Sequence, residues 1–220
     1  GNKVNAGDKV LTLTLNTPQA TTNSGAKTRA TNTDGTGSAE NQINRLTIGI
    51  FAPDDAVNHT PGVVRTIQEI TTGSTPGFTT DASHITSATI VTNSLSSDDS
   101  IFVAVNAPVG TFSKVQNRTD FLKSIEIDAA LTTGSNGSTP SVEAMDNIPM
   151  FGKCKIAIPS GDTTHYTATL SASHLLAKIT LAKITVAFDA AGPYSAATFQ
   201  PTAYFLINVP NYLRFYDVGW

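Results

Sequence analysis

One alternating segment near the N-terminus constrains the fold more than any other feature of the sequence. In the stretch KVLTLTLN, Leu11, Leu13 and Leu15 fall on one face of an extended chain and threonines fall on the other. A period of two is typical of a β-strand with one buried face. The next apolar run starts at Leu46, and residues 17–44 between the two runs are rich in Thr, Asn, Gly and Ser. The chain therefore attaches a well-formed strand to its domain by a long polar tether.

The composition agrees with an all-β protein. The chain has 220 residues, enough for one large all-β domain or two small ones, with 40% hydrophobic and only 14% charged residues. Threonine and serine replace many of the charged residues, and threonine fits a pleated, half-buried surface better than a helix. With a net charge of −3 and scattered Lys and Arg residues, the sequence offers no electrostatic basis for binding nucleic acid.

Short apolar or alternating segments separated by turn residues continue along the chain, which is the spacing of a sandwich or barrel. Beyond the first strand they lie at residues 45–52, 63–71, 88–95, 100–108, 153–159, 165–172 and 203–209. The runs at 100–108 and 203–209 are almost continuously apolar, so we expect both to be buried strands. At 153–159, the alternation predicts that Cys154, Ile156 and Ile158 point inward.

One segment, residues 119–131, reads as a helix. Its apolar residues Phe121, Leu122, Ile125 and Ala129 follow helical spacing, and Thr119 is placed to act as the N-cap.

Residues 176–185, LAKITLAKIT, repeat a five-residue unit directly. Five is odd, so a strand cannot keep both copies facing the same way, and we predict a β-bulge or break near residues 182–183. A strand buried on both faces is the alternative.

The sequence contains no recognisable catalytic or metal-binding motif. The histidines are far apart and none has the spacing of metal ligands. Cys154, the only cysteine, reads as a small buried hydrophobe, and no disulfide can form within the chain. The adjacent acidic pairs 54–55 and 98–99 read as solvated turn residues. We therefore expect no enzyme activity, no cofactor and no metal.

The order of several stretches resembles the fimbrillin family, the pilus subunits of Gram-negative anaerobes of the Bacteroides group. These stretches are LTLTLNT, KTRAT, NQINRLTIGIF, IFVAVNAP, FLKSIEI, IPMFGKCKIAI, LLAKITLAKITVAF and FQPTAYFLINVPNYLRF. Each is degenerate by itself, but together they run in family order across nearly the whole chain.

The resemblance implies a mechanism of assembly. Such subunits are exported as lipoprotein precursors to the cell surface, where they form a fimbrium, and their domains are transthyretin-like β-sandwiches. A protease cuts after an arginine in the tether, and the groove left by the first strand accepts a strand of another subunit. By position, Arg29 matches the cleavage arginine, and Ala30 would be the new N-terminus.

The residues around Arg29 support this interpretation independently. Arg29 is the only arginine before Arg45, and it lies in a stretch without core-forming residues, the preferred kind of site for proteolysis. Arg45 adjoins a predicted strand and should be protected. We therefore expect residues 1–29 to be a removable strand with its tether, and residues 30–220 to be the sandwich domain. Family members usually carry a second domain and a C-terminal donor strand, so this domain could be the first of two.

The sequence thus predicts a transthyretin-like Greek-key β-sandwich of about seven strands with one short helix. It favours a structural, tip or anchor subunit of a pilus, whose partners are other subunits and an arginine-specific maturation protease. The alternative is a surface module that binds glycans or host ligands and never polymerises. A polymerising subunit needs a removable, core-filling edge strand, and a binding module needs an exposed aromatic or acidic cluster in a pocket.

Overall fold

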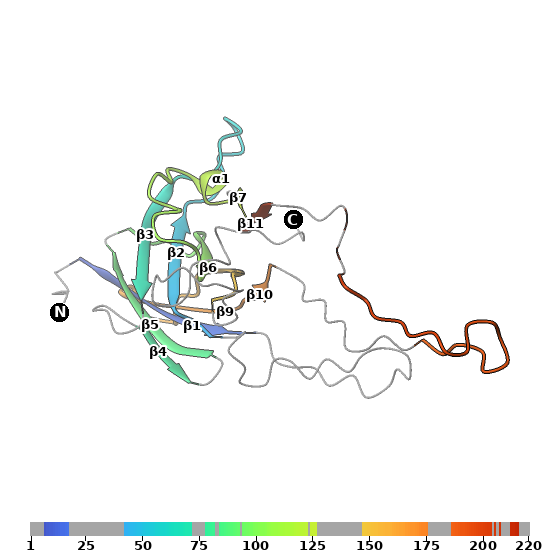
Figure 1. Ribbon diagram of the computed structural model, residues 1–220. Helices are drawn as coiled ribbons and strands as arrows, with labels where there is room; N and C mark the ends of the chain where they lie inside the picture. The colour runs from blue at the N-terminus through green and yellow to red at the C-terminus, as the bar shows by residue number, and fades with distance from the viewer. Residues whose placement is uncertain are drawn as a thin grey trace.

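Two larger β-sheets packed face to face form the main part of the described structure, as Figure 1 shows for a computed structural model. The structure describes residues 7–17, 42–71, 78–81, 84–92, 94–122, 124–126, 147–175, 186–203, 205, 207 and 212–215.

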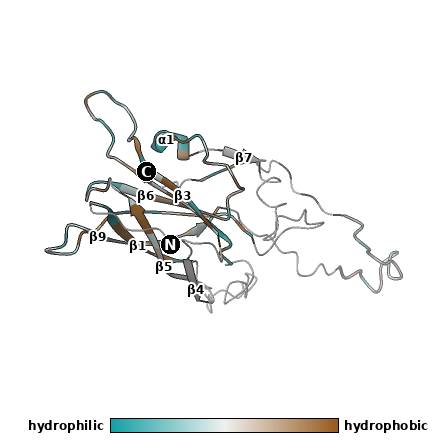
Figure 2. Cartoon of the chain, turned by 90° about the vertical axis from the view of Figure 1, so that its left-hand side faces the viewer, coloured by the Kyte–Doolittle hydropathy of each residue, from teal (hydrophilic) through white to brown (hydrophobic). Residues whose placement is uncertain are grey.

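The first sheet has four strands in the order β4-β5-β1-β9. These are β1 (Lys9–Asn16), β4 (Phe78–Asp81), β5 (His84–Thr92) and β9 (His165–Ser171). Figure 2 shows the four strands side by side. The strand nearest the N-terminus thus lies between two strands from distant parts of the chain.

The second sheet has five strands in the order β10-β8-β6-β2-β3, and all of its neighbours are antiparallel. Its members are β2 (Arg45–Phe51), β3 (Val64–Thr71), β6 (Ser100–Val105), β8 (Met150–Lys155) and β10 (Ser173–His174). Every side chain of β6 is buried, which explains why its sequence is apolar without alternation.

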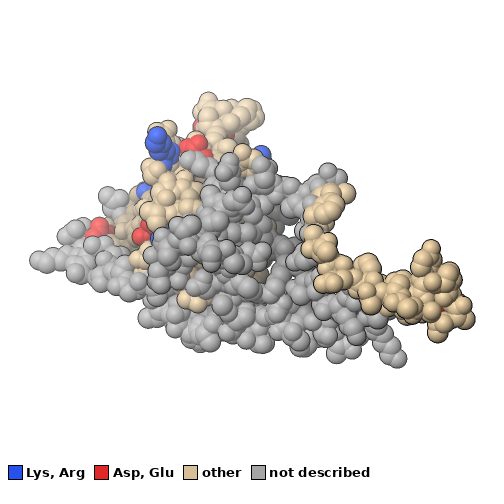
Figure 3. Space-filling model, viewed as in Figure 1, with Lys and Arg blue, Asp and Glu red and all other residues tan. Residues whose placement is uncertain are grey.

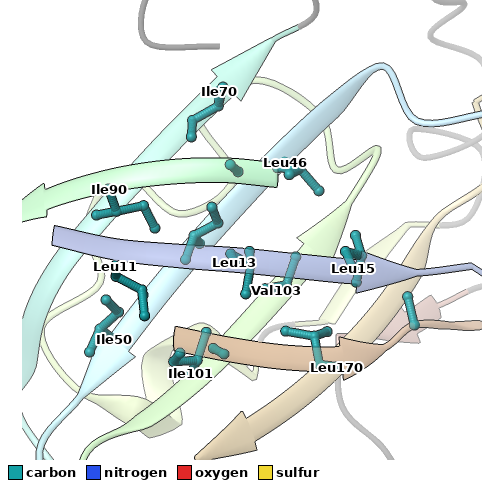
Figure 4. Close-up of a cluster of buried hydrophobic side chains, with 14 of the residues drawn as sticks. Leu11, Leu13, Leu15, Leu46, Ile50, Ile70, Ile90, Ile101, Val103 and Leu170 are labelled. Atoms are coloured by element: carbon teal, nitrogen blue, oxygen red, sulfur yellow. The ribbon is translucent and has the colours of Figure 1, made fainter. Parts of the chain in front are cut away.

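The main core lies between the two sheets. Figure 4 shows the leucines of β1 among apolar side chains of both sheets, including Leu46, Ile50, Ile70, Ile90, Ile101, Val103 and Leu170. Leu46, Ile48 and Ile50 of β2 belong to this core, as their shared parity predicts.

A second cluster of buried aromatic side chains covers the other face of the five-stranded sheet. Phe51 and Phe102 of the sheet contact Phe121, and Phe151 contacts Phe102. The rings of Phe112 and Phe121 stack with centroids 4.2 Å apart. Leu213 and Phe215 also belong to this cluster. They lie on or beside β11 (Tyr212–Arg214), which pairs with β7 (Ser124–Glu126). The two central strands β2 and β6 are therefore buried on both faces.

The prediction of an all-β sandwich is confirmed, although the described residues form eleven strands rather than about seven. The predicted strands at the positions of β1, β2, β3, β5, β6 and β9 are present, with ends that differ by a few residues. The segment predicted at 153–159 starts earlier and ends at Lys155, so Ile158 is 40% exposed and does not point inward.

The predicted helix over 119–131 is wrong in its length and its cap. The helix α1 spans only Arg118–Phe121, and its N-cap is Asn117, which forms a capping box with Asp120. The chain then enters β7, where Ile125 lies opposite Leu213. Strand pairing with a distant segment therefore overrides the local helical spacing. Residues 127–131 lie outside the described residues.

The predicted buried strand at 203–209 is not confirmed where the structure describes it. Residues 203, 205 and 207 are not in a strand, and Phe205 and Ile207 are 82% and 74% exposed. Residues 186–203 form an arm that contains turns but no strand and extends away from both sheets (Figure 1). An apolar run is buried as a strand only where neighbouring strands cover it, and the run itself does not specify those strands. The repeat at 176–185, with its predicted bulge, lies outside the described residues.

Candidate functional site

The strand β1 is an interior strand of its sheet. It pairs antiparallel with β5 on one side, from Lys9 opposite Thr92, and parallel with β9 on the other, from Val10 opposite His165. The expectation of an edge strand is therefore wrong. Strand order depends on distant pairing partners, which the alternation of a single segment does not encode. Removing β1 would expose backbone hydrogen-bonding groups on two strands rather than one.

The leucines of β1 fill the core as predicted. Leu11, Leu13 and Leu15 have no exposed surface, whereas Thr12 and Asn16 on the opposite face are exposed. Burying three leucine side chains contributes roughly 5–9 kcal/mol before the entropy of ordering the strand is subtracted. That is comparable with the net stability of a whole domain. β1 thus fills a place in the core that its removal would leave as an apolar groove.

Backbone hydrogen bonds hold both ends of β1. The Val10 N–H donates to the carbonyl of Thr164 at 2.8 Å, and the Ala172 N–H donates to the carbonyl of Asn16, also at 2.8 Å. These bonds continue the parallel ladder with β9 at both ends. Because they use only the main chain, any extended segment of suitable length can make them.

A buried asparagine fixes the chain where it returns from the tether. Asn106 accepts the N–H of Asn44 at 2.9 Å and donates to the carbonyls of Gln42 and Ile148. Its φ of +56° is in the left-handed region, which asparagine tolerates better than most residues. Asn44 also donates to Asn147 at 3.1 Å. This network was not predicted from the sequence, because nothing in the local pattern around Asn106 indicates that its side chain makes several hydrogen bonds. The network ties the far end of the tether to the domain without help from β1.

The structure places four of the five arginines in regular elements. Arg45 begins β2, and its Nε lies 3.0 Å from Oε1 of Glu69. The two groups form an ion pair, although Nε itself donates no hydrogen bond. Arg65 lies in β3 beside Asp99, Arg118 begins α1, and Arg214 ends β11. Arg29 and Ala30, the predicted cleavage residues, lie outside the described residues.

The acidic pairs are only partly the solvated turn residues that the sequence predicts. Asp55 and Asp98 are exposed, and Asp54 pairs with Arg118. Asp99, in contrast, has no exposed surface. Its carboxylate accepts the N–H of Ser96 at 2.9 Å and lies 3.4 Å from Nε of Arg65. A buried carboxylate with these partners holds a turn and a strand together, because an unpaired charge would be costly there.

Cys154 is half-buried against the main core, and burial raises the pKa of its thiol to about 11. A thiol that stays protonated at neutral pH is a poor nucleophile. The position is that of a structural residue, as the sequence indicates.

A polar turn precedes β9. The carboxylate of Asp162 accepts the N–H groups of Thr164 and His165, and these bonds lower the pKa of Asp162 to about 2. Asp162 also lies 2.8 Å from Nδ1 of His165. Both side chains are on the surface, and the same ring nitrogen faces Thr164 at 3.0 Å. The contacts therefore order a turn and do not form a relay toward a nucleophile.

Within the described parts of the chain, no three His, Cys, Asp or Glu side chains gather in a way that could hold a metal ion. No helix among these residues has the length and apolar character needed to cross a membrane. On the face shown in Figure 3, the described Lys, Arg, Asp and Glu side chains are scattered rather than gathered by sign.

The solved structures that are similar to this chain include two candidate cell adhesion proteins. A candidate cell adhesion protein from Bacteroides eggerthii is 19% identical with a TM-score of 0.44, over 76% of this chain and 40% of that one. A candidate cell adhesion protein from Parabacteroides distasonis is 14% identical with a TM-score of 0.42, over 72% of this chain and 38% of that one. The chain thus spans less than half the length of either. No curated protein matches it.

A family model also matches the chain, over residues 10–186, and its description is major fimbrial subunit protein (FimA). The match begins within β1, ends at the first residue of the extended arm, and includes both sheets of the sandwich. It confirms the family to which the order of sequence features points. The chain belongs to the major fimbrial subunit (FimA) family.

Proposed function

We propose that this protein is a structural or accessory subunit of a cell-surface pilus, and that it assembles by strand exchange at the groove of β1. A protease cuts the tether after Arg29, β1 leaves, and a strand of another subunit takes its place. The subunit acts in the stalk, at the tip or as an anchor. In this account, residues 1–29 are the removable segment and residues 30–220 form the domain that remains.

The observation that carries the proposal is the position of β1. It fills the core between the sheets, yet both of its sheet neighbours come from later parts of the chain. The next described strand along the chain, β2, belongs to the other sheet and does not pair with it. Once the tether is cut, β1 is a bound peptide that can leave only if another strand replaces it. Because it is an interior strand, its replacement must pair with both β5 and β9, which makes the exchange more selective than the extension of an open edge.

The arginine positions support Arg29 as the point of cleavage. Proteases act on segments that can unfold locally, and the other four arginines lie in strands or in α1. The contacts of Asn106 with Gln42 and Asn44 support the rest of the proposal, since they hold the segment just before β2 independently of β1.

Membership of a fimbrial subunit family supports a place at the cell surface. We propose that the protein reaches the surface as a lipoprotein precursor, that its partners are further pilus subunits and an arginine-specific protease, and that its domain has the transthyretin-like connectivity expected from the family.

Limited digestion with an arginine-specific protease tests the cleavage step. We expect the first cut after Arg29, read by mass spectrometry, and slow cleavage at Arg45 and Arg65. The far-ultraviolet circular dichroism of the cut protein should equal that of the intact chain. An Arg29→Gln variant is the matched control and should resist the first cut. Initial cleavage at Arg45 or Arg65 would contradict the proposal and favour a surface module that binds ligands without polymerising.

A further inference from the structure

The two ends of β1 are held unequally by side chains. At its start, Nζ of Lys9 donates to the carbonyl of Leu95 at 3.0 Å and lies 5.4 Å from the ring centroid of Tyr166. The ammonium group thus has a hydrogen bond and a contact with an aromatic ring that favours cations. The start of the strand is therefore well fixed.

The other end of β1 contains a buried polar group without a partner. Thr17 directly follows the strand and continues the inward series of Leu11, Leu13 and Leu15, with 4% of its surface exposed. Its hydroxyl oxygen has no hydrogen-bond partner among the described residues. A buried hydroxyl that loses its hydrogen bonds with water and gains none destabilises the structure. Thr17 of the resident strand is therefore an unfavourable residue for this last inward position.

A bulge in β5 fixes which residue of a strand takes that position. Leu13 lies opposite Ala88 and Leu15 lies opposite Ile85, so β5 contains one more residue than β1 over this interval. The same additional residue appears against β4, where Thr79 and Thr80 pair with Ser87 and Ile85. A bulge pins the register, because sliding by one residue would also turn the apolar side chains out of the core.

We propose that the position of Thr17 is a fourth, selective subsite of the groove, and that it takes a branched aliphatic residue from a strand of another subunit. The inference rests on the proposed strand exchange. Valine has nearly the shape of threonine but no hydroxyl, so it fills the same space without an unsatisfied group. The incoming strand makes the same backbone bonds as β1, so these bonds largely cancel between the two strands. The residue in the fourth subsite then favours binding of the incoming strand over β1. The subsite lies at the start of the tether, beside the end of β1 that cutting would free.

Competition between peptides tests the subsite. A recognition sequence for a site-specific protease is placed within residues 18–41, so that the test does not depend on Arg29. The cut full chain is mixed with a peptide of residues 8–19, or with its Thr17→Val form. We expect the Thr17→Val peptide to bind about tenfold more tightly, since the hydroxyl no longer has to be buried. A Thr12→Val peptide carries the same change on the exposed face and should bind within roughly twofold of the natural sequence.

A second measurement separates this inference from the function on which it rests. In the uncut chain, Thr17→Val should raise the urea midpoint of unfolding, and Thr12→Val should leave it nearly unchanged. If both peptides enter the cut protein with equal affinity, the selective subsite is refuted and strand exchange stands. If neither peptide enters, strand exchange itself is refuted. An unchanged midpoint in the Thr17→Val chain would also count against the subsite, because it would mean that the hydroxyl has found a hydrogen bond.

Discussion

Leu15 of β1 lies opposite Leu170 of β9 in parallel register, and both side chains are buried in the core between the sheets. The pair joins the segment before the tether to a strand some 150 positions later in the chain. In the proposed strand exchange, such contacts would hold β1 in place after its covalent link is cut. This arrangement is what strand exchange requires.

The central leucine of β1 should matter most for the stability of the uncut chain. Replacing Leu13 by alanine should lower the free energy of unfolding by roughly 2–5 kcal/mol, since it leaves a cavity in a fully buried site. Thr12→Ala, on the exposed face of the same strand, is the control and should cost less than about 1 kcal/mol. Urea denaturation followed by circular dichroism measures both values. Equal costs would mean that β1 does not fill the core.

Asn106 should be needed for both its side chain and its backbone conformation. Asn106→Gly removes the side-chain hydrogen bonds and should cost roughly 2–4 kcal/mol. Asn106→Ala should cost roughly 1 kcal/mol more, because alanine is strained at a φ of +56° and glycine is not. Urea denaturation of the two variants separates the contributions. A less stable glycine variant would contradict this account of the backbone.

The Asp162 turn should contribute to the pH dependence of stability only in acid. Hydrogen bonds from backbone N–H groups lower its pKa to about 2 in the folded protein, below the value of 3.8 expected without them. Its contribution is therefore fully present above pH 3.8 and is lost as the pH falls toward 2. Carboxyl chemical shifts in a nuclear magnetic resonance titration should place the Asp162 midpoint near 2, and Asp162→Asn should remove this part of the acid slope. A midpoint near 3.8 would show that the turn is not ordered in solution.

Cys154 should react slowly with thiol reagents in the folded protein. Its pKa of about 11 leaves almost no thiolate at pH 8, and the side chain is half-buried. Labelling followed by mass spectrometry should be slow in buffer and fast in urea. Because the unfolded thiol ionises near pH 9, stability should also fall between pH 9 and pH 11, and Cys154→Ala should lessen that fall. Rapid labelling without urea would place Cys154 on an open surface.

Local periodicity was sufficient to predict the strands whose faces differ in burial. In β1, Leu11, Leu13 and Leu15 alternate with threonines. In β9, Tyr166, Ala168 and Leu170 alternate with exposed residues. Each segment therefore has the alternation of a strand with one buried face. Continuous burial of β6 was also evident, because a strand covered on both faces has no polar side.

Features that depend on distant parts of the chain were not predictable in this way. The place of β1 inside its sheet depends on β5 and β9, and the strand β7 depends on its pairing with β11. The short helix failed as a prediction because the capping box of Asn117 and Asp120 begins it earlier, and strand pairing ends it. The unsatisfied hydroxyl of Thr17 and the hydrogen-bond network of Asn106 can be recognised only when burial and hydrogen bonds are known.

Native mass spectrometry can follow the replacement of β1 by a second strand. The chain is cut after Arg29 and mixed with an excess of an isotopically heavy peptide of residues 8–17. We expect that the light strand leaves, that one heavy strand takes its place, and that the sandwich stays folded, while the uncut chain takes up no peptide. A cut protein that keeps its light strand indefinitely, or unfolds without accepting the heavy one, would contradict assembly by strand exchange.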